Sequence, residues 1–276
     1  MNTLTLNNGL TIPAIGFGTY KVQCPAVITA LNEGYRYFDT ASFYGNESEI
    51  AEALTHSGTK REDVIIASKV WKSDMGYDSA INAFARTLEN LRCGYVDVYM
   101  IHWPRPNLEL EGWRELDLET RRAMEHLYSQ GKIRALGISN FLPYHAENIL
   151  SRCEVMPSTA QFEFHPGHLQ FPALEYYRQK GIQVQAWSPI GRGRVLDDVL
   201  IRELAGKYHV TPAQICIRFC IQEGVMPLPK ASSPERMREN LECLNFVIDE
   251  EDISRIENMP PLGWSGEHPD RERVKI

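Results

Sequence analysis

The sequence alternates eight short apolar runs with longer segments of helical periodicity, and this alternation constrains the fold more than any other feature. The runs are rich in β-branched and aromatic residues, which is typical of buried strands. They are residues 15–18, 35–39, 64–69, 96–102, 133–139, 158–163, 182–188 and 225–229. Because strands that alternate with helices form βαβ units, the pattern predicts an α/β fold with a parallel sheet.

Three of the intervening segments carry clear helix signals. Residues 78–91 place their apolar side chains on one stripe, as an amphipathic helix does. Residues 118–132 meet a stop signal at Gly131, and residues 211–224 begin with Thr211 at a capping position before a proline. Each segment is therefore expected to be a helix that covers the sheet.

Eight strand–helix units in 276 residues, without a Gly- or Pro-rich linker, predict one closed (β/α)8 barrel over residues 1–276. Before the first unit, Asn8-Gly9 between "LTL" and "LTIP" predicts an N-terminal β-hairpin. After the last unit, residues 262–276 are expected to form an irregular tail. A doubly wound open sheet is the alternative, but it would normally show a GxGxxG turn, which this chain lacks.

The composition excludes several classes of protein. The formal charge is −7 and no dense Lys/Arg block occurs, so a nucleic-acid partner is not expected. The chain has neither a leader-like N-terminus nor an apolar run of membrane-spanning length, which favours a cytoplasmic protein without a membrane partner. Its six cysteines show no CxxC spacing, and Cys216 and Cys220, four residues apart in an apolar helix, are interpreted as core residues.

Nearly every strand run ends on a polar or aromatic residue, although the run interiors are mostly apolar. Such residues cap single turns, but their repetition predicts a functional site, because barrel enzymes build their sites at the carboxyl ends of the strands. The residues in question are Asp39, Lys69, His102, Ser139, Asn140, Gln161, Glu163, Trp187 and Ser188.

Four side chains in this region suit the protonation of a carbonyl oxygen. The phenol of Tyr44 has an ordinary pKa of about 10, and a nearby ammonium such as Lys69 would lower it. The carboxylate of Asp39 would keep Lys69 charged, and His102 could bind the substrate oxygen.

Two other chemistries have weaker support. Acyl transfer would need a nucleophile of the GxSxG type, which the chain lacks. Asp39, His102, Glu163 and His165 could ligate a metal, but no HxH or HExxH pattern supports this interpretation, so no metal is expected.

The chain resembles the aldo-keto reductases over essentially its whole length. The segments "FDTASFYGNE", "ASKVW", "YMIHWP", "GKIRALGISNF" and "QFEFHP" follow the order of the family's motifs. The bacterial branch that includes 2,5-diketo-D-gluconate and methylglyoxal reductases is the most similar. The resemblance implies a (β/α)8 barrel that binds NADPH without a Rossmann domain and reduces a small carbonyl substrate.

The resemblance also assigns roles to individual residues. Tyr44 would be the proton donor, Lys69 would depress its pKa, Asp39 would pair with Lys69, and His102 would orient the carbonyl. Ser139, Asn140 and Gln161 would bind the nicotinamide carboxamide, while Trp187 would stack on the ring. The remaining implied cofactor residues are Gly18, Thr19, Asp39, Ser188, Ile190, Gly191, Lys230, Ser232, Arg236, Glu239 and Asn240.

One departure from the family pattern concerns the adenosine 2′-phosphate. Ala231 stands where the family usually has Ser or Thr, so one hydrogen bond to this phosphate would be missing. Ser232 or Ser233 could compensate. We therefore expect NADPH to be preferred over NADH, but less sharply than in relatives.

The substrate pocket is expected to be aromatic. Its implied lining is Tyr20, Phe43, Trp71, His102 and Trp103. The tail could place Trp264 and Arg271 or Arg273 over this pocket, or it could be a frayed terminus. Small aldehydes, α-dicarbonyls and keto-sugars fit such a pocket. A non-catalytic NADPH sensor on the same barrel and a metal-dependent hydrolase are the alternative functions, and a monomer is expected from the resemblance.

Overall fold

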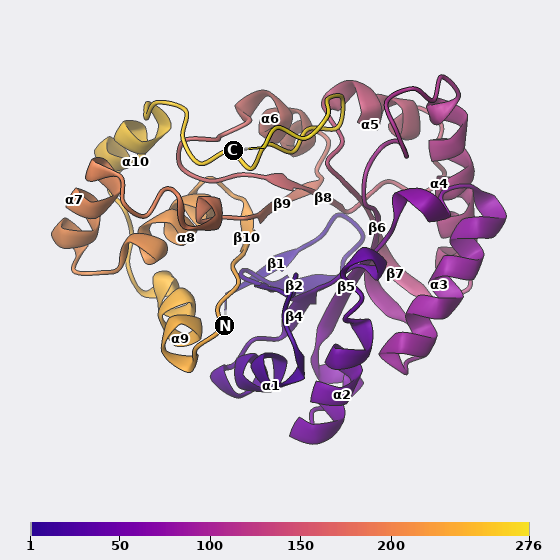
Figure 1. The fold of residues 1–276 in the computed structure, drawn as a ribbon, viewed down its shortest axis with the longest axis horizontal. Helices are drawn as coiled ribbons and strands as arrows, with labels where there is room; N and C mark the ends of the chain where they lie inside the picture. Colours follow the sequence, from indigo (N-terminus) through magenta and orange to yellow (C-terminus); the bar gives the residue numbers. More distant parts are fainter. Residues whose placement is uncertain (1, 276) are drawn as a thin grey trace.

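The computed structural model describes residues 2–275, which form a barrel of eight parallel strands surrounded by helices (Figure 1). Each strand pairs in parallel with the next one along the chain. The strands are β3 (Phe17–Gly18), β4 (Tyr37–Asp39), β5 (Ile65–Val70), β6 (Val96–Ile101), β7 (Ile133–Ser139), β8 (Thr159–Glu163), β9 (Gln183–Trp187) and β10 (Met226–Leu228). The predicted (β/α)8 barrel is thus confirmed.

Two backbone hydrogen bonds close the barrel between its first and last strands. The amide of Gly16 donates to the carbonyl of Pro227, and that of Gly18 donates to Pro229, each at 3.0 Å. A Cβ on Gly18 would lie 2.9 Å from the carbonyl oxygen of Leu228, so only glycine allows this approach.

The helices lie outside the sheet, and the tail that follows the last of them crosses one end of the barrel (Figure 1). They are α1 (Cys24–Glu33), α2 (Glu47–Ser57), α3 (Tyr77–Leu91), α4 (Trp113–Ser129), α5 (Pro143–Leu150), α6 (Phe171–Gln179), α7 (Val199–Tyr208), α8 (Pro212–Gln222), α9 (Pro234–Glu242) and α10 (Glu250–Glu257). Short 3-10 turns, including η1 (Ser42–Tyr44), η3 (Lys72–Asp74) and η4 (Gly191–Gly193), occupy several loops.

The three helices expected from the sequence are present as α3, α4 and α8. Helix α4 begins five residues earlier than expected, at Trp113, and its chain turns at Gly131 with φ +71°. Helix α8 is capped as expected, because the Thr211 side chain accepts from the amide of Gln214. Cys216 and Cys220 are fully buried on this helix, as core residues are.

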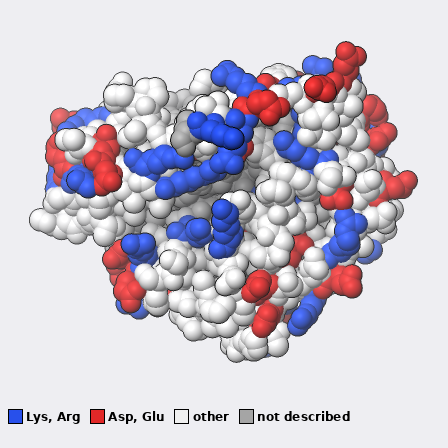
Figure 2. Space-filling view, viewed as in Figure 1, with Lys and Arg blue, Asp and Glu red and all other residues white. Residues whose placement is uncertain are grey.

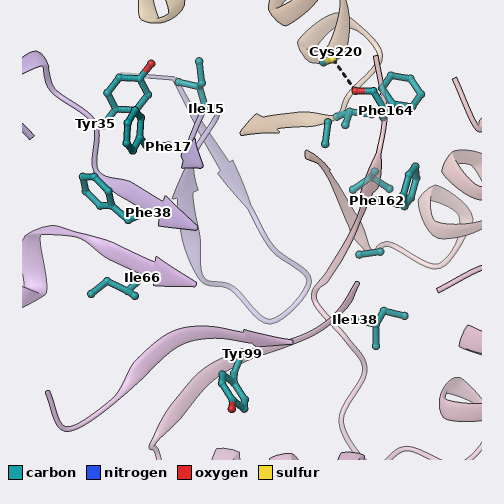
Figure 3. Close-up of a cluster of buried hydrophobic side chains, with 14 of the residues drawn as sticks. Ile15, Phe17, Tyr35, Phe38, Ile66, Tyr99, Ile138, Phe162, Phe164 and Cys220 are labelled. Carbon is teal, nitrogen blue, oxygen red and sulfur yellow. Dashed lines mark hydrogen bonds between the residues drawn. The ribbon is translucent and has the colours of Figure 1, made fainter. Parts of the chain in front are cut away.

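The outer core fills the space between the strands and the helices. Figure 3 shows part of it, with Phe17, Phe38 and Ile66 pointing outward from neighbouring strands. Because side chains alternate along a strand, the residues on either side of Phe38 point into the barrel.

A second cluster fills the interior of the barrel beneath the site. It contains Leu6, Ile12, Tyr37, Ala67, Val98, Met100, Ala135, Met226 and Leu228. Two of these residues come from the predicted N-terminal hairpin, which forms as β1 (Thr3–Thr5) and β2 (Thr11–Pro13) with its turn at Gly9, φ +87°. The hairpin therefore closes the amino-terminal end of the barrel and leaves the other end for function.

Within residues 2–275, no helix combines the length and the apolar character that a membrane span requires.

Candidate active site

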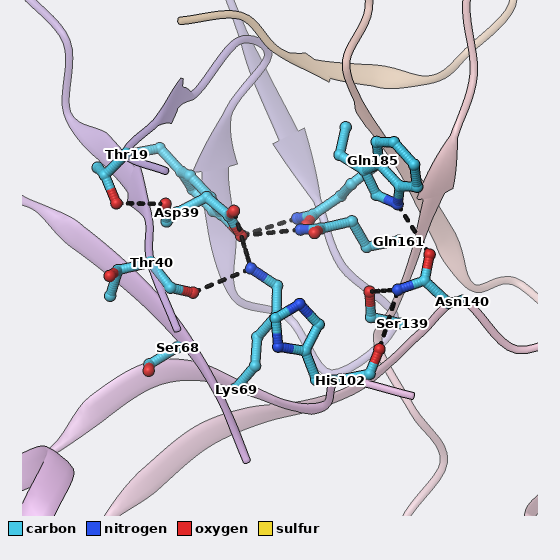
Figure 4. Close-up of polar contacts among 12 residues, drawn as sticks. Thr19, Asp39, Thr40, Ser68, Lys69, His102, Ser139, Asn140, Gln161 and Gln185 are labelled. Atoms are coloured by element: carbon cyan, nitrogen blue, oxygen red, sulfur yellow. Dashed lines mark hydrogen bonds and ion pairs between the residues drawn. The ribbon is translucent and has the colours of Figure 1, made fainter. Parts of the chain in front are cut away.

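The strand register brings Asp39 and Lys69 together at the carboxyl end of the barrel. Asp39 lies two residues beyond Tyr37, and Lys69 lies two residues beyond Ala67, so both side chains continue inward-facing rows. The Lys69 ammonium donates to both Asp39 carboxylate oxygens at 2.8 Å and to the carbonyl of Thr40 at 2.9 Å (Figure 4). All three ammonium protons are therefore used in hydrogen bonds, and the expected pairing of Asp39 with Lys69 is present.

This ion pair lies out of contact with solvent. The Lys69 side chain is fully buried and that of Asp39 is 5% exposed. Burial lowers the pKa of Lys69, while the charge and hydrogen bonds of Asp39 oppose that shift. Asp39 also accepts a hydrogen bond from the Gln161 amide at 2.8 Å, which fixes the carboxylate from the side of β8.

Tyr44 lies beside this pair in η1, the turn that follows β4. The Lys69 ammonium is 5.2 Å from the centroid of the Tyr44 ring, and Ser42 of the same turn donates to the Lys69 carbonyl at 3.0 Å. The pKa of Tyr44 is raised well above its usual value, first by burial and then by the charge of Asp39. The expected net lowering of this pKa is not found, because burial and the charge of Asp39 dominate at this position.

The Tyr44 hydroxyl is protonated at neutral pH, as a phenol with the ordinary pKa of about 10 also is. It can therefore donate a proton to a developing alkoxide.

His102 immediately follows β6 and faces the same site. Its ring centroid lies 5.7 Å from that of Tyr44 and 5.0 Å from that of Trp71, in edge-to-face contacts. Burial lowers the pKa of His102 well below its usual value, and the positive charges of Lys69 and Lys72 lower it further. The imidazole is therefore neutral, and its Nδ1 atom is buried without a hydrogen-bond partner in the described chain.

The aromatic residues expected in the pocket lie beside Tyr44 and His102. Phe43 stacks on Trp71 with ring centroids 3.9 Å apart, and Tyr20 lies 5.0 Å from Tyr44. Trp103 lies further out, where it lines a cavity under the tail. The structure thus brings these four residues to one mouth.

The amide side chain of Asn140 connects the site to Trp187 at the end of β9. Asn140, in the left-handed region at φ +62°, donates to the carbonyl of His102 and to the Ser139 hydroxyl. Its amide oxygen accepts from the Trp187 indole at 2.9 Å, so the half-buried indole is held in a fixed orientation. A fixed flat ring beside the buried polar side chains of Ser139 and Asn140 fits a planar heterocycle such as nicotinamide.

The implied cofactor residues Ser188, Ile190 and Gly191 lie in a tight turn after β9. Ser188 and Gly191 have φ values of +53° and +55°, and the Gly191 amide donates to the Ser188 carbonyl at 2.8 Å. That amide is therefore used inside the turn. Arg192, at 5.8 Å from the centroid of the Trp187 ring, adds a cation beside Ile190.

The segment expected to bind the 2′-phosphate follows β10 and starts α9. Lys230, Ser232 and Arg236 are exposed there, whereas Ala231 is buried. Ser233 caps α9 by accepting from the Arg236 amide at 3.4 Å, so Ser232 is the hydroxyl left to compensate for Ala231. These donors and cations fit a phosphate monoester.

Three other implied cofactor residues are buried or half-buried, namely Thr19, Glu239 and Asn240. Thr19 is buried and donates from its hydroxyl to the Asp39 carbonyl at 2.8 Å. Asn240 is buried on α9, while Glu239 beside it is half-buried.

The tail lies over the mouth of the barrel, which confirms one of the two expectations for it. Glu163 at the end of β8 accepts from both the amide and the hydroxyl of Ser265, at 2.9 and 2.6 Å. Trp264 and Arg271 line a cavity of about 320 Å³ together with Trp103. Arg271 and Arg273 are both exposed, and Arg273 pairs with Glu267.

A second anchor fixes the tail further on. The carboxylate of Asp270 accepts from Arg105 at 2.7 Å and contacts the His145 Nε2 atom at 3.0 Å. Tyr144 donates to the other oxygen of the same carboxylate at 2.5 Å. Sequence reasoning missed this anchor, because its members are more than a hundred residues apart along the chain.

Sequence reasoning also missed Gln185 in β9. This buried amide donates to the hydroxyl of Tyr37 at 2.8 Å and accepts from Gln161 at 3.1 Å. It thereby extends the polar row below Asp39. An amide between the apolar residues of the run "QVQAW" was the available signal.

Three of the four residues considered as metal ligands are engaged in other contacts, namely Asp39, Glu163 and His165. The Lys69 ammonium occupies the position where a cation would meet Asp39. Glu163 holds Ser265 and lies 3.3 Å from the His165 ring, which belongs to the loop after β8. The arrangement is suited to proton transfer and to holding a flat cofactor ring.

Comparison with known proteins agrees with this geometry. The chain matches the aldo/keto reductase family over residues 15–260. It is 37% identical to glyoxal reductase of Bacillus subtilis over 274 residues, which are 98% of this chain and 96% of the relative.

Solved structures of similar proteins share the whole fold. A crystal structure of an aldo/keto reductase from Brucella melitensis has a TM-score of 0.86 and 35% identity, covering 92% of this chain and 98% of its own. A mutant of Gox0644 in complex with NADPH has a TM-score of 0.90 and 32% identity, covering 99% of both chains. The family match and these relatives define a class of oxidoreductases that use a nicotinamide cofactor.

The chain belongs to the aldo/keto reductase family.

Proposed function

We propose that this protein is an NADPH-dependent reductase that converts small aldehydes, α-dicarbonyls or keto-sugars to alcohols. The observation that carries the proposal is the buried Asp39–Lys69 pair beside Tyr44, with the neutral His102 in edge-to-face contact with the phenol ring. The B. subtilis relative named glyoxal reductase supports an α-dicarbonyl substrate.

The chain's residues account for the proton side of this reaction. NADPH, when bound, supplies the hydride that is added to the carbonyl carbon. His102 holds the carbonyl oxygen through an N–H of its neutral ring. Tyr44 donates its proton to that oxygen as the carbon–oxygen double bond becomes single, and solvent then restores the phenol.

Lys69 and Asp39 act on the phenolate that remains after the donation. The Lys69 ammonium, 5.2 Å from the Tyr44 ring, stabilises the negative charge, and Asp39 keeps Lys69 protonated despite its burial. Lys69 and Asp39 thus stabilise the Tyr44 phenolate, and neither residue gains or loses a proton over the reaction.

The cofactor is proposed to be NADPH rather than NADH. Lys230 and Arg236 would bind the 2′-phosphate, and Ser232 would supply the hydroxyl that Ala231 lacks. Replacing Lys230 by methionine should raise KM for NADPH about tenfold or more while changing KM for NADH little. A wild-type kcat/KM for NADH equal to that for NADPH would contradict this assignment.

Tyr44→Phe tests the proposed function. Consumption of NADPH would be followed with methylglyoxal, phenylglyoxal, 4-nitrobenzaldehyde and a diketo-sugar. We expect wild-type turnover and a loss of at least about 100-fold in the variant, since one general acid contributes about 10²–10⁴-fold. Quenching of tryptophan fluorescence by NADPH controls for binding. Quenching without turnover in the wild type would instead support a sensor.

A further inference from the structure

Three side chains of the kinds that bind transition metals meet where α1 packs against α2, and the reductase proposal gives them no task. Cys24 is the first residue of α1, while Glu52 and His56 lie one turn apart on α2. Figure 1 shows the two helices side by side. One ligand atom of each residue lies within 4.8 Å of those of the other two. The sulfur, oxygen and nitrogen atoms therefore face one small common space.

The distances between these atoms are close to those that a single zinc ion requires. Cys24 Sγ lies 3.9 Å from His56 Nδ1, which in turn lies 3.8 Å from Glu52 Oε1. Zinc bonds of about 2.3 Å to sulfur and about 2.0–2.2 Å to nitrogen or oxygen, at tetrahedral angles, separate ligand atoms by roughly 3.3–3.6 Å. Because the Glu52 and His56 side chains are exposed, they have room for this small adjustment.

The charge around the three residues also favours a cation. Glu49 adds a second carboxylate, which accepts a hydrogen bond from the Cys24 amide at 2.6 Å. Within residues 2–275, no Lys or Arg nitrogen lies within 4.0 Å of the Glu49 or Glu52 carboxylate. In Figure 2, acidic side chains lie over α2, whereas Lys and Arg side chains follow the edges of the hollow near the middle of the same face. Two carboxylates without a basic partner attract a divalent ion.

We propose that Cys24, Glu52 and His56 form a binding site for one Zn²⁺ ion, with water as the fourth ligand. Thiolate, imidazole and carboxylate are the protein ligands that Zn²⁺ takes, whereas Mg²⁺ and Ca²⁺ take oxygen ligands. The site lies on the outer helices, away from the strand-end residues for which no metal is expected. It is independent of the proposed reductase function, because none of its residues belongs to the site of Tyr44.

The ion would join two helices that begin at loops of the active site. Helix α1 follows the segment that contains Tyr20, and α2 follows η1, which contains Tyr44. Asn46, just before α2, already joins these segments, because its amide donates to the carbonyls of Thr19 and Val22 at 2.7 and 3.0 Å. Bound Zn²⁺ would add a second link and stabilise the folded protein, since it binds that state preferentially.

A metal titration of the protein without a histidine tag, after treatment with EDTA, tests the proposal. One equivalent of Co²⁺ should produce the near-ultraviolet charge-transfer absorption of a cobalt–thiolate bond, and Zn²⁺ should displace it. Cys24→Ser should lose this absorption. Glu52→Gln and His56→Gln, which alter exposed side chains, should each weaken Zn²⁺ binding at least about tenfold, since even residues that only orient a ligand contribute about 10–100-fold. Saturating Zn²⁺ should raise the wild-type Tm by about 5 °C and that of His56→Gln much less.

Cys93→Ser and His209→Asn are the matched controls, because they remove a half-buried thiol and an exposed imidazole elsewhere on the chain. Both should bind Co²⁺ and Zn²⁺ as the wild type does. A wild-type protein without the cobalt–thiolate absorption would overturn the proposal. Absorption that persists in Cys24→Ser, or that is lost in Cys93→Ser, would place the ion at another thiol and also overturn it. Unchanged Zn²⁺ affinity in both Glu52→Gln and His56→Gln would do the same, because a single thiol would then account for the binding.

Discussion

Replacing Lys69 by methionine should lower the free energy of unfolding, because the Asp39 carboxylate loses its cationic partner. Lys69 is fully buried and its three hydrogen bonds to Asp39 and Thr40 are 2.8–2.9 Å long. The variant would leave the Asp39 carboxylate buried with only its Gln161 donor. Removing one partner of such a pair costs about 3–5 kcal/mol, because the other charge stays unpaired in a medium of low polarity.

The reciprocal variant, Asp39→Asn, should cost a similar amount, since it leaves an unpaired ammonium. The double variant Asp39→Asn/Lys69→Met buries no charge, so its loss should be smaller than the sum of the two single losses by at least about 2 kcal/mol. Urea unfolding of the four proteins at neutral pH, with fluorescence and circular dichroism transitions required to coincide, measures this coupling. Single losses below about 1 kcal/mol that simply add would refute the reasoning.

Three further expectations follow. Gly137→Ala should lower stability by about 1–3 kcal/mol in urea, because its Cβ would lie 2.4 Å from the Thr159 hydroxyl. Burial lowers the pKa of His145 to about 4, so stability is fully present above pH 6.5 and should fall from there toward pH 4, with a flatter profile in His145→Gln. Ser265→Ala, which removes a 2.6 Å bond to Glu163, should raise KM several-fold with little change in kcat in steady-state assays.

The periodicity of the sequence was sufficient to predict the barrel, because strands buried on both faces and amphipathic helices leave different patterns. The polar strand ends also marked the site, since inward-facing rows from Tyr37 and Ala67 end on Asp39 and Lys69. Each row of inward-facing residues can be recognised within a single strand, and the parallel register of the strands then brings the ends of the rows together.

Contacts that depend on the closed fold could not be predicted in the same way. The anchors of the tail at Glu163 and Asp270 join residues far apart in sequence, and no periodic pattern records them. The pKa of Tyr44 is expected to fall from the sequence, but its direction depends on how much water the surroundings exclude and on how close the Asp39 carboxylate lies. Both quantities are properties of packing.

A single-turnover experiment shows whether Tyr44 donates the proton when this barrel reduces a carbonyl. Enzyme is in excess over NADPH, and methylglyoxal is at saturating concentration. In the wild type, the absorbance of reduced nicotinamide should decay in one phase as one equivalent of alcohol forms per NADPH. Tyr44→Phe should bind NADPH normally, but its absorbance should decay at least about 100-fold more slowly. Decay at the wild-type rate in Tyr44→Phe would show that another group donates the proton.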